Sequence, residues 1–311
     1  MNTSRKVIGI GETVLDILFQ NGQPQRATPG GSVFNGIISL CRCGVPALFV
    51  GELGNDAVGQ LIRSFMETNR LATDYIDFFD DGLSPLALAF PDENRNARYA
   101  FYKDFPETRV KVPFPEIRAN DVLMFGSYFA VQPEVRTKVR EWLQYARSQQ
   151  ALLYYDINFR KAHAGERQAL LPHFFENFEW ATLIRCSDED LQTLFPQQSI
   201  GEIYHRYFLP AGKILIVTQG ENDVLLKTPA WEKAYPVKAV RPVSTIGAGD
   251  NFNAGWVYGI LKYRIPTASI GGLPEKQWDR LIHYAQRFAA EVCLSWENYV
   301  PENFIPEKRR R

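Results

Sequence analysis

The stretch STIGAGDNFNAGW, which starts at residue 244, places three small residues directly before an acid and then begins a helix-like pattern. Gly247 and Gly249 allow backbone conformations that are closed to other residues, and Ala248 adds little bulk. Their amides can converge with the free N–H groups of a first helical turn and bind a phosphoryl group. The Asp250 carboxylate could then accept the proton of an attacking hydroxyl. A plain turn with Asp250 as the helix N-cap explains the same letters.

Two segments near the N-terminus carry polar groups that suit a sugar. In TPGGSVFNGIISL, Gly30 and Gly31 precede a predicted helix, and Asn35 offers hydroxyls both a donor and an acceptor. Asp16 follows the first predicted strand, where a carboxylate could accept hydrogen bonds from two hydroxyls. Taken singly, a turn before a helix and a solvated aspartate are the commoner explanations.

Short apolar runs alternate with longer amphipathic segments along the chain, a pattern typical of buried strands alternating with helices. The predicted strands are KVIGI (6–10), ALFVG (47–51), VLMFG (122–126), LLYYD (152–156) and KILIVT (213–218). The clearest predicted helices are 133–147 and 275–296, the second with an apolar stripe that ends at Cys293 and Trp296. We therefore expect one α/β domain over 1–311, with a mainly parallel sheet covered by helices on both faces.

Two stretches break this alternation and have the pattern of antiparallel ribbons, at about 12–31 and 84–107. In the second, LALAF and RYAFY alternate around the polar turn PDENRNA, which predicts a hairpin. Both ribbons could join into one small sheet beside the main sheet. Such a sheet would serve either as a movable lid over a site or as a purely structural addition.

Composition excludes several classes of partner. Thirty-five basic residues balance 35 acidic ones, so no overall charge would recruit nucleic acid or a membrane surface. The four cysteines and four histidines show no disulfide or metal-ligand spacing. The N-terminus lacks the apolar core of a signal peptide, and no apolar run reaches membrane length. We expect a cytoplasmic enzyme with small-molecule substrates.

Taken together, the motifs are more specific than each alone. GE…D, GG…N, VGELGNDAVG (50–59) and STIGAGDNFNAG (244–255) occur in an order that resembles the PfkB-type carbohydrate kinases, the ribokinase-like family. The resemblance runs from about Val7 to Trp296 and implies a three-layer α/β/α core with a β-sheet lid, ATP and Mg²⁺. It makes Asp250 the catalytic base and assigns the anion hole to Gly247, Ala248 and Gly249. The residues that fall where the family binds sugar hydroxyls are Asp16, Gly30, Gly31 and Asn35.

Three more stretches take roles from this resemblance. YDINFRKA is similar to the DxNxR segment of fructokinases and ketodeoxygluconate kinases, so Asn158 and Arg160 are candidate contacts to substrate or transferred phosphate. IVTQGENDVLL resembles a TxGxxG nucleotide segment, which places Thr218 and Gly220 by ATP. The metal is not assigned to particular ligands. The family's NxxE motif, which organises Mg²⁺ and phosphate, reads SDED here, with Ser187 and Asp190 at its ends.

The chain departs from the family at Ser244, where an acid is usual, and this weakens the expectation of a K⁺ site beside the loop. Asp223 replaces the last glycine of TxGxxG, and we expect it in a turn. These departures and those at Ser187 and Asp190 favour a non-catalytic sugar-binding or regulatory relative, whereas Asp250 with both loop glycines favours an enzyme. A Rossmann dehydrogenase fits less well, because GIGETV breaks the GxGxxG spacing.

Fructose is the first choice of substrate, because DINFR, the GE start and RYAFYKD look like the corresponding segments of fructokinases. Ketodeoxygluconate is the close alternative, and its carboxylate would need a cation such as Lys103 or Arg160. Lid strands pair across dimers in some family members, which implies a possible homodimer through the lid.

Overall fold

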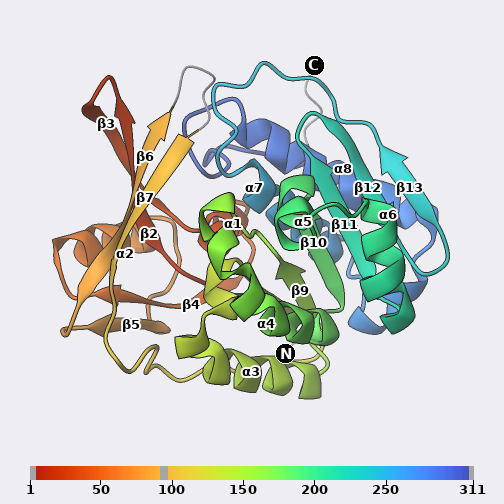
Figure 1. Cartoon of the computed structure of the whole chain (residues 1–311), viewed down its shortest axis with the longest axis horizontal. Helices are drawn as coiled ribbons and strands as arrows, with labels where there is room; N and C mark the ends of the chain where they lie inside the picture. The colour runs from red at the N-terminus through yellow and green to blue at the C-terminus, as the bar shows by residue number, and fades with distance from the viewer. Residues whose placement is uncertain (1–4, 92–96, 308–311) are drawn as a thin grey trace.

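A large twisted sheet forms the centre of the molecule (Figure 1). The computed structural model describes residues 5–91 and 97–307. Within these residues the sheet has nine strands in the order β13-β12-β11-β10-β9-β8-β1-β4-β5. The strands are β1 (Val7–Ile10), β4 (Ala47–Gly54), β5 (Ile76–Phe79), β8 (Val122–Gly126), β9 (Leu152–Asp156), β10 (Leu183–Ser187), β11 (Ile214–Gln219), β12 (Asn222–Lys227) and β13 (Glu232–Tyr235).

The strands from β5 to β11 are mutually parallel, and only β12 and β13 add antiparallel pairs at one edge. All residues of β1, β8 and β9 are buried, as expected for strands covered on both faces. The chain passes from β1 to β4 on one side and later returns to β8 on the other. Ligands of such sheets bind outside the carboxyl ends of the strands at a reversal of this kind.

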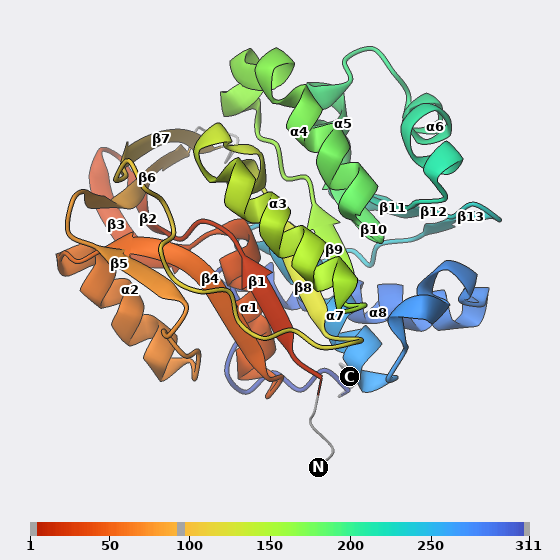
Figure 2. The ribbon, with the colours of Figure 1, turned by 90° about the horizontal axis from the view of Figure 1, so that it is seen from below.

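Helices cover both faces of this sheet, which Figure 2 shows edge-on. One apolar cluster joins the sheet to Trp256 and Trp278, and the other joins it to Trp142 and Phe174. The helices on the first face are α1 (Ser32–Arg42), α2 (Ala57–Thr68), α7 (Ala248–Lys262) and α8 (Glu275–Val292). Those on the second face are α3 (Pro133–Ser148), α4 (Arg167–Trp180) and α5 (Asp188–Leu194). Shorter helical turns are η1 (Tyr128–Val131), η2 (Lys161–Glu166), α6 (Ile200–Ile203), η3 (Tyr204–Phe208), η4 (Leu209–Ala211) and η5 (Thr267–Gly272).

A second sheet, which we call the lid sheet, stands beside the large one in the order β3-β2-β6-β7 (Figure 1). Its strands are β2 (Val14–Gln20), β3 (Gln23–Gly30), β6 (Leu83–Pro91) and β7 (Ala97–Asp104). Each predicted ribbon is antiparallel, and β2 and β6 join the two ribbons as a parallel pair. Asn21 and Gly22 connect β2 to β3 with φ of 52° and 74°, the left-handed pair that a tight hairpin requires. The central residues of the predicted PDENRNA turn, 92–96, lie outside the described residues.

The structure confirms the predicted α/β fold and the five predicted strands. Two expectations were wrong, and one central strand was missed. The predicted helix 275–296 ends at Val292, and Trp296 is 54% exposed because the chain has already left the helix. Asp223 lies within β12 rather than in a turn, because the turn forms at Gly220 with φ of 60°. Strand β10 was not predicted, since Arg185 interrupts its apolar run. The four cysteines are free.

Candidate active site

The first turn of α7 presents unpaired backbone amides. Gly247 is its N-cap with φ of 78°, and a Cβ there would lie 2.7 Å from the carbonyl oxygen of Asn298. Only glycine suits both constraints. The amide of Ala248 donates to the carbonyl oxygen three residues earlier at 3.2 Å. Within the described residues, the amides of Gly249 and Asp250 have no acceptor, so these two remain free for an anion.

The carboxylate of Asp250 is buried and oriented by a residue from the other glycine motif. Its Oδ2 accepts a hydrogen bond from Nδ2 of Asn35 at 2.8 Å. Helices α1 and α7 can approach closely because Gly36 has no side chain. A Cβ there would lie only 3.1 Å from the Asp250 carbonyl oxygen. Oδ1 of Asn35 is buried without a partner in the described chain, so it can accept a hydrogen bond from a hydroxyl.

The electrostatic surroundings of Asp250 suit a proton acceptor. Burial raises its pKa to about 6, the hydrogen bond from Asn35 opposes this rise, and the Asp156 charge adds to it. The Arg160 charge also lowers the pKa, which brings that predicted residue within electrostatic reach of Asp250. A carboxylate with this pKa is ionised at neutral pH and still basic enough to take a proton from a hydroxyl.

Asp16 and the double glycine form the wall of the site nearest the lid sheet. A Cβ at Gly30 would lie 2.0 Å from Oδ2 of Asp16, so the carboxylate occupies the space that a side chain would need. Gly31 has a φ of 134°. A Cβ on Gly31 would lie 2.1 Å from the carbonyl oxygen of Glu12, in the β1–β2 connection. Oδ2 of Asp16 also accepts a hydrogen bond from Nδ2 of Asn298 at 3.2 Å. Glycine is required at both positions for these contacts.

Asp16 and Asp250 interact as two carboxylates of one site. Burial raises the pKa of Asp16 to about 7, the negative charge of Asp250 adds to the rise, and the hydrogen bond from Asn298 opposes it. Like charges at short range disfavour double ionisation. A ligand that donates hydrogen bonds to Asp16 would relieve this repulsion, as the hydroxyls of a sugar can.

A buried ion pair that our sequence analysis did not single out lies beside these groups. Nη1 of Arg185 donates to Oδ1 of Asp156 at 3.1 Å. Oδ2 of Asp156 accepts from Asn253 at 2.9 Å and from the Ser32 hydroxyl at 3.3 Å. The other guanidinium arm donates to the hydroxyl of Thr218. The sequence signals for this pair are an acid, Asp156, at the end of the apolar run LLYYD and an arginine, Arg185, inside the apolar run LIRCS.

The predicted nucleotide residues occupy the carboxyl ends of β10 and β11. Ser187 and Asp190 form a capping box on α5: the serine hydroxyl accepts from the Asp190 amide at 3.1 Å, and the Asp190 carboxylate accepts from the Ser187 amide at 2.7 Å. In this capping position Asp190 is only 2% exposed. The hydroxyl of Thr218 accepts a hydrogen bond from Arg185. Gly220 lies further out, in the exposed turn between β11 and β12.

The two predicted residues after β9 differ in their placement. Asn158 has a φ of 38°, a left-handed backbone that costs energy for a residue with a side chain. Arg160 is exposed, and its side chain has no hydrogen-bond partner within the described chain. It is therefore available to bind an anionic group near Asp250.

The lid sheet touches the core through β7. Nζ of Lys103 lies 2.7 Å and 2.9 Å from the two carboxylate oxygens of Glu12. The same ammonium lies 5.2 Å from the centre of the Tyr128 ring, and this ring stacks on His163 at 3.8 Å. Phe101 of β7 also stacks on His163, at 6.0 Å. These contacts hold the lid sheet against η1 and η2.

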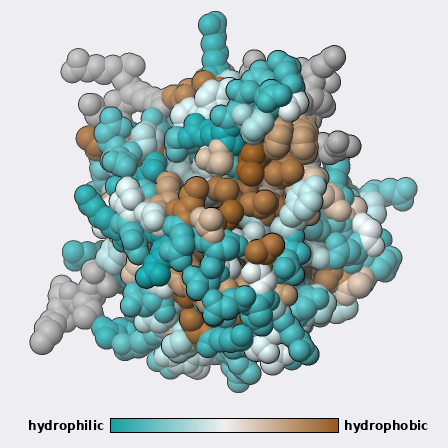
Figure 3. Space-filling view, turned by 90° about the vertical axis from the view of Figure 1, so that its left-hand side faces the viewer, coloured by the Kyte–Doolittle hydropathy of each residue, from teal (hydrophilic) through white to brown (hydrophobic). Residues whose placement is uncertain are grey.

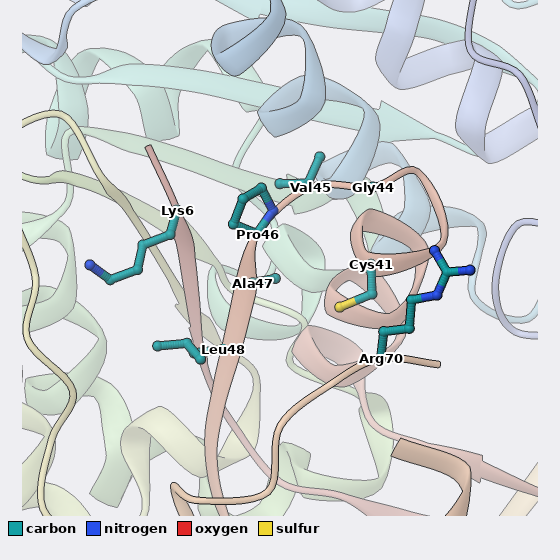
Figure 4. A pocket seen from close by; sticks show the side chains of 8 residues that line it. All are labelled: Lys6, Cys41, Gly44, Val45, Pro46, Ala47, Leu48 and Arg70. Atoms are coloured by element: carbon teal, nitrogen blue, oxygen red, sulfur yellow. The ribbon is translucent and has the colours of Figure 1, made fainter. Parts of the chain in front are cut away.

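A separate pocket of about 390 Å³ opens at the opposite end of the sheet (Figure 4). Lys6, Pro46 and Ala47 place it at the amino ends of β1 and β4, away from Asp250. No described helix is long and apolar enough to cross a membrane. Nor do the described residues contain three or more metal-ligating side chains in one cluster.

A carboxylate beside free helix amides, on an α/β sheet with a second small sheet, is an arrangement that suits phosphoryl transfer. Comparisons with known proteins agree. A family model described as pfkB family carbohydrate kinase matches residues 8–300. Fructokinase-1 of Oryza sativa subsp. japonica is 25% identical over 299 residues, covering 92% of this chain and 91% of the relative. Probable fructokinase-2 of Arabidopsis thaliana is 26% identical over 258 residues, covering 79% and 78%.

Solved structures share the fold. A fructokinase from Vibrio cholerae O395 in a fructose, ADP and calcium ion bound form gives a TM-score of 0.81 at 20% identity, covering 96% of this chain and 95% of that one. A fructokinase with bound ATP from Xylella fastidiosa gives 0.82 at 18% identity, covering 95% of each chain. The chain belongs to the pfkB family of carbohydrate kinases, so it is an ATP-dependent enzyme with the ribokinase-like fold.

Proposed function

We propose that this protein is a fructokinase, which transfers the γ-phosphoryl group of ATP to a hydroxymethyl group of fructose. The observation that carries the proposal is the buried Asp250 carboxylate, oriented by Asn35 beside two unpaired amides of α7. The fructokinases among its relatives support fructose as the acceptor.

In the proposed mechanism, Asp16 accepts hydrogen bonds from the sugar and Oδ1 of Asn35 accepts another. The hydroxymethyl oxygen attacks the γ-phosphorus and its proton passes to Asp250. The bond from this phosphorus to the β–γ bridging oxygen breaks, and ADP leaves with the electron pair. The free amides of Gly249 and Asp250 stabilise the charge on the transferred oxygens.

Mg²⁺ would accompany the nucleotide and neutralise part of its charge. No cluster of three or more ligating side chains occurs among the described residues, which fits a Mg²⁺ ion held mainly by phosphate oxygens and water. Ser187 and Asp190 would then contribute chiefly through the helix that they cap. A K⁺ site beside the loop remains a prediction that Ser244 weakens, and a double mutant of the Vibrio cholerae O395 fructokinase was solved in a fructose, ADP and potassium ion bound form.

Ketodeoxygluconate kinase is the second candidate. Its substrate carries a carboxylate, and the two cations suggested for it are Lys103 and Arg160. Lys103 is engaged by Glu12 at 2.7 Å, so Arg160 is the cation with an unengaged side chain. Of the two cations, Arg160 is therefore the one that could bind the carboxylate of ketodeoxygluconate. A non-catalytic relative remains the candidate from a different class, and retention of Asp250 in its buried hydrogen bond with Asn35 argues against it.

A homodimer through the lid sheet also remains a proposal. Figure 3 shows apolar side chains gathered on the side of the molecule that faces the viewer there. Leu83 of β6 and Tyr102 of β7 are 59% and 58% exposed. Large exposed apolar side chains on one sheet support pairing with a second copy.

The test is an ATP-consumption assay over fructose, ketodeoxygluconate, ribose, tagatose and nucleosides, each with and without K⁺. The proposal predicts the highest kcat/KM for fructose. A higher value for ketodeoxygluconate would select the second candidate. Fructose binding without ATP consumption would select the non-catalytic relative.

A further inference from the structure

Arg185 is a buried cation in the middle of β10, and its side chain reaches the first turn of α7. Arg185 is only 5% exposed. A Cβ at Gly249 would lie 2.8 Å from Nη2 and 2.9 Å from Nη1, so the guanidinium rests directly against the backbone of Gly249. The side chain reaches this place between Asp156 at the end of β9 and Thr218 at the end of β11.

These partners do not use the full hydrogen-bonding capacity of the Arg185 guanidinium. Its Nε is buried and has no hydrogen-bond partner within the described chain. The carboxylate to which it donates, Asp156, is shared with Asn253 and Ser32, and the charge of Asp190 also lies within electrostatic reach. A buried donor without an acceptor costs stability.

The neighbouring helix terminus makes this arrangement more costly still. The amino end of α7 carries a partial positive charge, and its amides at Gly249 and Asp250 are unpaired. A guanidinium beside a helix amino terminus places two positive groups together. An anion bound at this point would satisfy both, and the γ-phosphoryl group is the anion that the proposed reaction brings there.

A second buried arginine shows what a purely structural one looks like in this fold. Arg136 of α3 is 4% exposed and donates to the carboxylate of Glu176, to Asn177 and to the carbonyl oxygen of Ala130. It packs with the second-face helices, on the opposite side of the sheet from α7. Every nitrogen of its guanidinium has a partner, in contrast to Arg185.

We propose that Arg185 supplies a fixed positive charge to the phosphoryl group at the Gly249–Asp250 amides, held in place by Asp156. As the γ-phosphorus leaves the β–γ bridging oxygen for the sugar hydroxyl oxygen, negative charge grows on the transferred group and on ADP. Arg185 lowers the energy of this charge, while the hydroxyl proton passes to Asp250. The inference rests on the proposed function, because it takes the site at α7 to be the phosphoryl site.

The test compares Arg185→Met and Arg185→Lys with Arg136→Met as the matched buried control. Steady-state kinetics with ATP and fructose should show kcat lowered by at least about 100-fold in Arg185→Met, with a KM for fructose within about threefold of wild type. Arg185→Lys should retain an intermediate kcat. Arg136→Met should lower Tm and leave kcat within about threefold of the wild type. Arg185→Met with a kcat as high as that of the control overturns the inference.

A binding measurement separates this inference from the assigned substrate. The affinity of wild type and variants for Mg·ADP alone, and for Mg·ADP with aluminium fluoride as a phosphoryl mimic, is measured by isothermal titration calorimetry. Loss of Arg185 should weaken binding of the fluoride complex much more than binding of Mg·ADP. Equal weakening of both contradicts the inference. If no sugar is phosphorylated by the wild type, the proposed function fails and this measurement still decides the role of Arg185.

Removal of the guanidinium alone leaves Asp156 buried without its partner, so Arg185→Met could fail to fold. The double variant Arg185→Met/Asp156→Asn removes both charges and keeps the fold testable. It should show the same selective loss of the fluoride complex. Wild-type affinity for that complex in the double variant overturns the inference.

Discussion

The side-chain amide of Asn35 donates to the carboxylate of Asp250 at 2.8 Å, across 215 positions of sequence. This one hydrogen bond joins the helix that follows the double glycine to the helix that follows the GAGD loop. It holds the predicted base in one orientation and brings the sugar-side and phosphate-side motifs into a single site. A base held in this way needs no rearrangement before it takes a proton.

Removal of this hydrogen bond should change the pH dependence of activity. Asn35 opposes the burial that raises the pKa of Asp250, so Asn35→Ala should raise that pKa further. The acid limb of the kcat/KM profile, which reports ionisation of the base, should then move to higher pH. The profile is measured from pH 5 to 9. Asn55→Ala, which removes an exposed amide bonded to Asp80, is the control and should leave the limb unchanged. An unshifted limb in Asn35→Ala would mean that Asp250 does not set it.

The same carboxylate should make the fold less stable as the pH rises. The pKa of Asp250 is about 6 in the fold against 3.8 for the free side chain, so the folded state binds the proton more tightly. Stability from this proton is complete below pH 3.8 and is lost as the pH rises through about 6. At pH 8 this loss is at most about 3 kcal/mol.

Asp250→Asn, which cannot ionise, should therefore have a higher Tm than wild type at pH 8. The advantage should shrink toward pH 4. Thermal unfolding followed by circular dichroism across this range provides the comparison. A Tm difference that stays constant with pH would contradict the raised pKa of Asp250.

Close packing of Gly30 on Asp16 should make the sugar side sensitive to a single methyl group. The Cβ of Gly30→Ala would lie 2.0 Å from Oδ2 of Asp16 and must displace that carboxylate. Loss of a charged hydrogen-bond acceptor should raise the KM for fructose by about 10- to 100-fold with little change in the KM for ATP. Gly271→Ala, where the added methyl meets nothing within 4 Å, is the matched control. Equal effects on both KM values would remove Asp16 from the sugar site.

The Lys103–Glu12 ion pair offers a test of substrate choice. Glu12→Gln removes the charge that engages Lys103 and leaves this cation available to a carboxylate. The ratio of kcat/KM for ketodeoxygluconate to that for fructose should rise, by about tenfold if one charged hydrogen bond forms. Glu67→Gln, from an exposed pair with Arg63, serves as control. No change in the ratio would show that Lys103 does not reach the substrate.

Local patterns predicted the parts of this structure that depend on neighbouring residues. Apolar runs identified five strands, and the loop glycines with their acid identified the start of α7. Contacts between distant segments carry no such signal. Asn298 meets Asp16 only through tertiary folding, and Arg185 meets Gly249 because β10 ends beside α7. The role of Asp190 at the nucleotide stays a prediction, and its capping hydrogen bond to the backbone of α5 was not foreseen from the sequence.

The most direct measurement is the turnover of fructose by Asp250→Asn beside wild type, with sugar binding measured on both. The amide keeps the size of the side chain and cannot accept the proton. We predict a loss of kcat of at least about 100-fold, with fructose affinity nearly unchanged. A kcat close to wild type would remove Asp250 from the role of base and contradict the account at its centre.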